Sequence, residues 1–164
     1  MKGSLRFAGW LLALAALLLA GCATPARTSA PPGTAVWTGR MALQVEESSS
    51  QSFSAGFELK GSAHTGELTL FTPLGGTLAV LSWAPGSALL RSNGQTRQFE
   101  SVDALVNHAT GAPIPVAALF DWLGGVNTPV PGWQPDLSQL AQGRLSARRL
   151  DPPPAADLRV AFER

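Results

Sequence analysis

Residues 66–83 read GELTLFTPLGGTLAVLSW, and two runs with apolar residues at every second position flank a turn in this stretch. In the first run Leu68 and Leu70 share one face, and in the second Leu81 and Trp83 share one face. A period of two is typical of a β-strand, because successive side chains of a strand point to opposite faces. The stretch therefore predicts two antiparallel strands joined by a short turn.

The turn between these runs carries an apolar residue at its tip. Pro73 presets its own backbone angle and Gly75 closes the turn, which suits a type I turn. Leu74 lies between them, where short polar residues are more usual. Its side chain either folds back onto the sheet or projects into solvent, and turn chemistry alone leaves both alternatives open.

The same alternation extends in both directions along the chain. It recurs in RMALQV, SFSAGFELK, ALLRS and QTRQF, and Asn93-Gly94 marks a tight hairpin between the last two. Six strands joined by short turns predict an antiparallel meander. Near the end of the chain, GRLSARRL and DLRVAFER predict closing strands, and Pro129, Pro131 and Pro135 predict a loop before them.

Two short helices interrupt the strands. Ser101 is suited to begin the first helix as its N-cap and Gly111 to end it. Pro115 suits the first turn of a second helix, which Gly124-Gly125 stops. We therefore expect a mainly β fold, a curved antiparallel sheet with helices set against its concave side.

The first residues of the chain predict an export signal. Lys2 and Arg6 precede an apolar run over residues 10–19, which is shorter than the roughly 20 residues a membrane-spanning helix needs. The run ends in LAGC, residues 19–22, which resembles the bacterial lipobox. The alternative is an ordinary secretory signal with a stray cysteine.

The lipobox reading makes Cys22 the site of lipidation and residues 1–21 a cleaved signal peptide. Cys22 is the sole cysteine of the chain, so it has no partner for an internal disulfide. Ala23 follows it, which resembles lipoproteins of the outer-membrane class. Residues 22–35 are rich in small residues and proline and predict a flexible tether to a domain over residues 36–164. These features predict a lipid-anchored protein on the periplasmic face of the outer membrane.

The remaining chain is nearly neutral. Without the signal it has 143 residues, and removing Lys2 and Arg6 leaves 10 basic residues against 11 acidic ones. Lys60 is the single lysine left. With no basic patch in the sequence, nucleic acid is excluded as an expected partner.

The sequence offers no catalytic constellation. It has no Gly-x-Ser-x-Gly elbow and no glycine-rich phosphate loop. His64 and His108 lack metal-ligand spacing, and the neighbours Glu46 and Glu47 point to opposite faces if they lie in a strand. We therefore expect no enzyme activity, no cofactor and no metal.

Large aromatic residues are numerous for a small sheet, although tyrosine is absent. They either fill a core completely or, together with the helices, enclose a cavity for an apolar ligand. Six residues on sheet faces or helix stripes that should turn inward are our candidates for the lining of such a cavity. They are Trp37, Phe57, Leu59, Trp83, Leu119 and Trp122.

Three motifs together resemble the LolB family of outer-membrane lipoprotein receptors, and the resemblance runs from about Trp37 to Gly125. The motifs are VWTGRMAL, LTLFTPLGGTLAVL and GAPIPVAALFDWLGG. The resemblance implies an incomplete antiparallel β-barrel, similar to LolA and LolB, with helices over an apolar cavity. It also implies a protein that accepts acylated lipoproteins from the periplasmic carrier LolA. Such a protein inserts them into the inner leaflet of the outer membrane. We expect a monomer.

The resemblance also assigns a role to the turn. In the family the tip leucine of this hairpin is exposed, and Leu74 is the matching residue, so Pro73, Leu74 and Gly75 form the implied membrane-insertion loop. From Gln142 onward the chain looks shorter than the family pattern and DPPPAAD interrupts a strand, which leaves a missing or reduced closing strand open. The alternative functions are a structural or assembly lipoprotein that binds a protein partner without a lipid cavity, and an envelope hydrolase.

Overall fold

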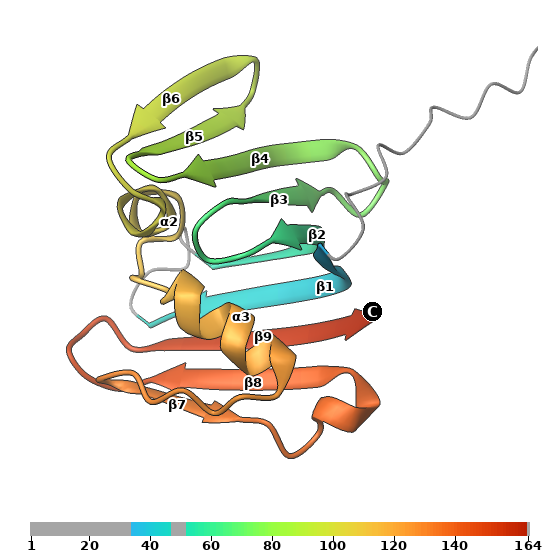
Figure 1. Ribbon diagram of the computed structural model, residues 1–164, viewed down its shortest axis with the longest axis vertical. Coiled ribbons are helices and arrows are strands. Elements are labelled where there is room, and N and C mark those ends of the chain that lie inside the picture. The colour runs from blue at the N-terminus through green and yellow to red at the C-terminus, as the bar shows by residue number, and fades with distance from the viewer. Residues whose placement is uncertain (1–33, 47–51, 164) are drawn as a thin grey trace, which may run out of the picture.

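The computed structural model describes residues 34–46 and 52–163, and within them nine strands form one antiparallel sheet with two helices against one face (Figure 1). The strands are β1 (Ala35–Val45), β2 (Phe53–Gly61), β3 (Gly66–Phe71), β4 (Thr77–Ala84), β5 (Ser87–Ser92), β6 (Gln95–Phe99), β7 (Trp133–Asp136), β8 (Arg144–Arg149) and β9 (Ala156–Glu163). The helices are α2 (Val102–Thr110) and α3 (Val116–Gly124), and a short 3₁₀ helix, η3, covers Leu140–Gln142.

The strand order is β6-β5-β4-β3-β2-β1-β9-β8-β7. The first six strands therefore follow one another as the predicted meander, and the chain then returns to pair β9 with β1 from Thr38 to Val45. The DPPPAAD segment begins as the bend between β8 and β9, and the strand after it is present. Because β6 and β7 are free edges, the sheet stays open, as expected for an incomplete barrel.

The prediction of a loop across Pro135 was wrong. Pro135 lies within β7 and is paired with Ala147 of β8. Proline has no backbone N–H to donate to a neighbouring strand, but it is tolerated at the edge of a sheet, where its nitrogen can face away from the ladder. The position of β7 at the edge explains how a proline-rich segment forms a strand here.

The helix ends match their sequence signals. The hydroxyl of Ser101 accepts the backbone N–H of Ala104 at 3.1 Å, which caps α2. The backbone N–H of Gly111 donates to the Asn107 carbonyl at 2.8 Å and ends that helix. Pro115 lies one residue before the first turn of α3 instead of inside it, and Gly125 ends the helix. In the part of the chain that the structure describes, neither helix is long and apolar enough to cross a membrane.

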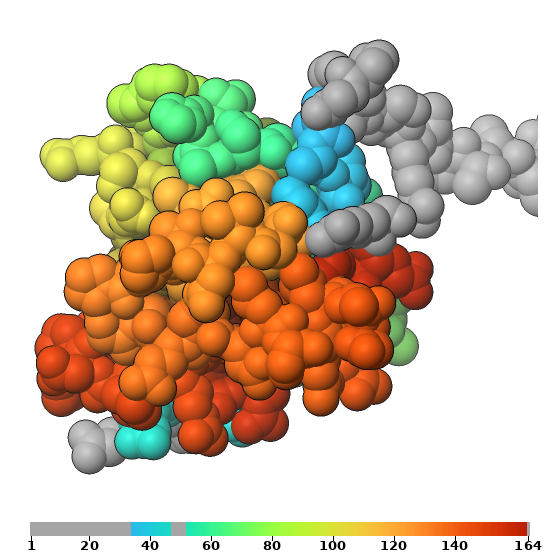
Figure 2. Space-filling model, turned by 60° about the horizontal axis from the view of Figure 1, so that its bottom comes forward, coloured from blue at the N-terminus to red at the C-terminus, as the bar shows by residue number. Residues whose placement is uncertain are grey.

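The core lies on the concave face of the sheet, beneath the helices. On one side, helix α3 packs on the β1–β6 half of the sheet through Phe120, whose ring is 5.6 Å from that of Trp37 and 6.2 Å from that of Trp83. On its other side, the Trp122 ring lies 6.3 Å from that of Trp133 of β7. Seen from below, α3 and the segment after it spread over one face of the molecule (Figure 2).

Candidate functional site

A cavity of about 430 Å³ lies between the concave face of the sheet, α2 and the first turn of α3. Its walls are mostly apolar and come from β1 to β5, from β9 and from the helical segment. The strands contribute Leu59, Leu68, Leu70, Ala79, Leu81 and Trp83, among others, and the helical segment contributes Val102, Val106, Ile114, Val116 and Leu119. The cavity is therefore a half-enclosed apolar space and not a filled core.

The polar groups of this lining are paired with one another or with backbone. The indole N–H of Trp83 donates to the Ser62 carbonyl at 3.0 Å. The buried hydroxyl of Thr110 donates to the Val106 carbonyl at 2.8 Å and accepts the Ala112 N–H at 3.2 Å. Among the described residues, the sole buried side-chain polar atom without a partner is Nε1 of Trp37, which is not part of the lining. The wall thus matches an apolar ligand better than a polar one.

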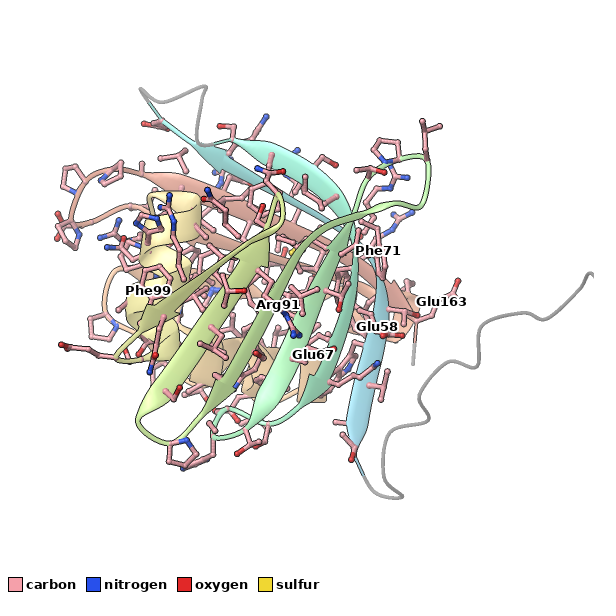
Figure 3. The ribbon with its side chains drawn as sticks, turned by 90° about the horizontal axis from the view of Figure 1, so that it is seen from above. Glu58, Glu67, Phe71, Arg91, Phe99 and Glu163 are labelled. Carbon is pink, nitrogen blue, oxygen red and sulfur yellow. The ribbon has the colours of Figure 1, made fainter. Side chains whose placement is uncertain are left out.

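Helix α2 forms one side of the cavity and is tied to the edge strand β6. The ring of His108 lies 5.1 Å from that of Phe99, which flanks the helix in Figure 3. Arg97 donates to Nε2 of His108 at 3.2 Å. Because β6 has no strand on its outer side, α2 is held against one of the two free edges of the sheet.

The structure divides the six candidate lining residues into two groups. Leu59, Trp83 and Leu119 line the cavity. Trp37, Phe57 and Trp122 are also buried but do not line it. Trp37 packs on Phe120, and the indole N–H of Trp122 donates to the Thr128 carbonyl at 2.9 Å.

Leu68, Leu70 and Leu81 belong to the lining although we did not name them as candidates. Their period of two had already placed Leu68 and Leu70 on one face, and Leu81 is buried on the same concave side. What the sequence lacked was the position of the helices, which decides how far along each strand the space extends.

The β3–β4 turn holds Leu74 in solvent. The Gly75 N–H donates to the Thr72 carbonyl at 2.9 Å, and the Gly76 N–H donates to the Thr72 hydroxyl at 3.1 Å. Gly75 has a φ of 84°, a conformation that glycine adopts without strain. The Leu74 side chain is 98% exposed, so it does not fold back onto the sheet.

Metal chemistry has no support in the described part of the chain, where no group of three or more His, Cys, Asp or Glu side chains is placed to hold an ion. The signal peptide, the lipidation site at Cys22 and most of the tether lie outside the described residues. The assignments for those segments therefore stay predictions.

Comparison with known proteins identifies similar chains. The family model described as outer membrane lipoprotein LolB matches residues 36–152. Outer-membrane lipoprotein LolB of Bordetella petrii is 41% identical over 127 residues, which cover 73% of this chain and 63% of that protein. The protein of the same name from Cupriavidus pinatubonensis is 35% identical over 149 residues, covering 86% of this chain and 71% of the relative. The chain thus spans less than two thirds of the length of the Bordetella relative.

Proposed function

The chain belongs to the LolB family, and we propose that it is an outer-membrane lipoprotein receptor that takes acylated lipoproteins from the carrier LolA and inserts them into the inner leaflet of the outer membrane. The observation that supports this proposal is the apolar cavity beneath α2 and α3. Its walls offer contact to a hydrocarbon chain, and the exposed Leu74 offers contact to a membrane.

The size of the cavity fits one acyl chain. A cavity of about 150 Å³ holds one benzene molecule, so a cavity of about 430 Å³ holds roughly 17 hydrocarbon carbons. That is the length of one long fatty acyl chain. A client with more than one chain needs the helices to move away from the sheet, and the edge position of β6 makes α2 the element best placed to move.

Transfer in this proposal runs downhill by differential affinity. Each acyl methylene removed from water contributes about 0.8 kcal/mol, so an acylated client cannot leave one apolar site without reaching another. The receptor must hold the chains more strongly than the carrier does, and the membrane more strongly than the receptor does. An apolar wall without unpaired polar groups suits this role because it imposes no directional bond that must break on release.

We expect Ala79→Phe to lower the affinity for a fluorescent fatty-acid probe by about tenfold or more, while the fold is kept. Ala79 lies on the cavity wall, so the added ring occupies space that the probe needs. Parent protein should take up about one probe per chain, measured by fluorescence titration. The matched control is Ala84→Phe at the exposed end of the same strand, which should bind the probe as the parent does.

If the parent protein takes up no probe, the receptor proposal fails and a structural lipoprotein becomes the better assignment. If both phenylalanine variants bind normally, the acyl chain does not occupy this cavity.

The anchor is tested separately from the cavity. We expect Cys22→Ala, exported behind a cleavable signal, to give a protein that is released from membranes by a high-salt wash, which also screens electrostatic contacts. The reason is that the proposed acyl groups are then absent, and a single exposed leucine does not hold a domain on a bilayer. Mass spectrometry of the membrane-purified parent protein should show acylated Cys22. An unmodified Cys22 in that sample would contradict the lipoprotein assignment.

A further inference from the structure

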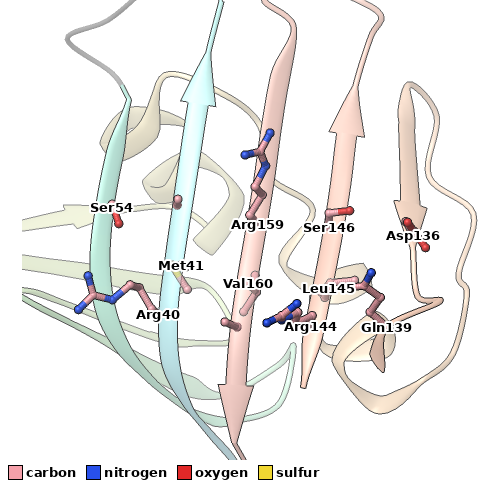
Figure 4. A pocket seen from close by; sticks show the side chains of 12 residues that line it. Arg40, Met41, Ser54, Asp136, Gln139, Arg144, Leu145, Ser146, Arg159 and Val160 are labelled. Atoms are coloured by element: carbon pink, nitrogen blue, oxygen red, sulfur yellow. The ribbon is translucent and has the colours of Figure 1, made fainter. Parts of the chain in front are cut away.

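A second concave site lies on the opposite, outer face of the sheet. It is a groove of about 420 Å³ that crosses β1, β9 and β8, with part of the β7–β8 connection at one side. Arg40 of β1, Arg159 of β9 and Arg144 of β8 stand around it (Figure 4). Between them the lining has small side chains, including Ala42, Ala161 and Ser146, which leave the guanidinium groups accessible from outside.

Strand register brings the three arginines together. Ala161 is the partner of Arg40 on one side and of Arg144 on the other, so these two arginines lie in one row across three strands. Arg159 lies two residues further along the central strand, on the same face. With strands about 4.8 Å apart and a rise of about 3.4 Å per residue, the three Cα atoms lie within about 10 Å of one another.

The charge of this cluster is only partly neutralised. Among the described residues, no carboxylate lies within ion-pair distance of Arg40 or Arg144. Arg159 forms an ion pair with Asp157, with 2.8 Å between Nε and Oδ1. The other oxygen of that carboxylate, Oδ2, lies 3.1 Å from Nε of Arg148.

Asp136 is an acidic residue at the edge of the groove. Hydrogen bonds from the hydroxyl and the backbone N–H of Ser138 lower its pKa, so its carboxylate is charged at neutral pH. The groove is therefore lined by three arginines and one carboxylate, Asp136. A second carboxylate, Asp157, is shared between Arg159 and Arg148, which lies outside the groove. The net charge of the groove is positive.

The groove adjoins the base of the hairpin that carries Leu74. Arg40 is the register partner of Gly56, and Gly56 is the partner of Phe71, three residues before Leu74. A Cβ built on Gly56 would lie 3.4 Å from the Cβ of Phe71, so the phenyl side chain covers the glycine on the outer face. Cationic, aromatic and aliphatic groups therefore follow one another toward the hairpin tip.

Acidic residues lie on the other side of the arginine row. Glu58 and Glu163 are both register partners of Thr38, two residues before Arg40 and away from the hairpin. Figure 3 shows both glutamates beyond Phe71 as seen from the hairpin. On the hairpin side of the arginine row, Arg159 is followed by a row in which Asp157 pairs with Arg148. Even with Asp157 and Asp136 counted, the rows toward Leu74 carry more guanidinium groups than carboxylates.

We propose that the groove binds the phosphate group of an anionic phospholipid in the leaflet that Leu74 contacts. Arginine suits this ligand because its planar guanidinium donates two parallel hydrogen bonds to phosphate oxygens. A leaflet presents phosphate and hydrocarbon in the same order as the arginines and Leu74, which a soluble acidic partner does not. The site is separate from the cavity and rests on the membrane location proposed above.

The test uses the mature chain with Cys22→Ala, exported behind a cleavable signal, so that no acyl group holds it to a vesicle. Its partition is measured by flotation with phosphatidylcholine vesicles that contain either no phosphatidylglycerol or about one third of it. We expect binding mainly to the anionic vesicles. Arg40→Gln and Arg144→Gln should each lower the partition roughly fivefold, and the double variant roughly 30-fold.

Arg91→Gln is the matched control, because Arg91 is an exposed arginine on β5, four strands from β1. It should leave the partition unchanged, and all variants should bind the fatty-acid probe as the parent does.

Equal losses for Arg91→Gln and the groove variants would overturn the site, as would normal binding of the double variant. Displacement by inorganic phosphate at matched ionic strength would instead reveal a free-anion site and overturn the phospholipid assignment. Loss of probe binding with intact vesicle binding would count against the cavity and not against the groove.

Discussion

The Leu74→Glu variant is expected to accept an acylated client from LolA nearly as well as the parent and to fail almost completely in inserting it into the membrane. Leu74 is 98% exposed and makes no core contact that the substitution could remove. Surface substitutions of this kind usually change stability by less than about 0.5 kcal/mol. The defect should therefore appear at the step that needs the membrane.

The size of the effect follows from the environment that the tip meets. Burying a leucine side chain in hydrocarbon gains about 1.5–3 kcal/mol. A charged residue at the bilayer centre instead costs about 2.5–3.5 kcal/mol, and less near the surface. Under the proposed function, the gain from burying Leu74 is too small to anchor the protein but should bias a lipid-tethered domain toward contact with the leaflet. In Leu74→Glu this gain becomes a cost, so the bias toward the leaflet is lost. The acyl chains would then have no direct route from the cavity into hydrocarbon.

The measurement is a transfer assay that scores receptor-bound client and membrane-inserted client separately. Leu74→Met is the matched control, because it keeps an apolar tip of similar size and should insert client normally. A fall of several kcal/mol in the unfolding free energy of Leu74→Glu would show that Leu74 supports the fold. Normal insertion by that variant would remove the hairpin from the mechanism.

Much of the fold could be predicted because it depends on local patterns. A period of two, short turns and capping residues place the six strands of the meander and both helices. The exception is β7, whose proline reads as a loop signal because nothing local tells an edge strand from an inner one. Only the pairing of Pro135 with Ala147 on one side makes the strand possible.

The cavity was less predictable, since a period of two gives the face of a residue but not what covers it. Trp37 and Leu59 are register partners and are both buried, yet only Leu59 lines the cavity. The ring of Phe120 from α3 packs on Trp37, and neither residue is part of the lining. The arginine groove was still less visible, because its members come from strands far apart in the sequence and only register unites them.

The second large prediction compares a buried residue that lines the cavity, Trp83, with a buried residue that does not, Trp122. Both are buried, and both indole N–H groups donate to a backbone carbonyl. Trp83 lines the cavity, whereas Trp122 packs against Trp133 between α3 and β7. The pair therefore allows the same substitution to be compared at two buried tryptophans, one on the cavity wall and one away from it.

Trp122→Gln is expected to lower the unfolding free energy by about 3–5 kcal/mol, because it removes a fully buried ring and leaves a polar amide in its place. That is a large part of the roughly 5–15 kcal/mol that stabilises a domain. Its folded fraction should still bind the fatty-acid probe with nearly parental affinity. Trp83→Gln should be destabilised less, because its amide reaches the existing cavity, but it should lose about tenfold or more in probe affinity.

Urea unfolding gives the free energies, and probe titration under folding conditions gives the affinities. The two variants separate core packing from ligand contact only if their losses diverge in these two measurements. Equal losses of probe affinity in two folded variants would mean that acyl chains reach the far side of α3. The space beneath the helices would then extend to Trp133 when a client is bound, and α3 would have to move together with α2.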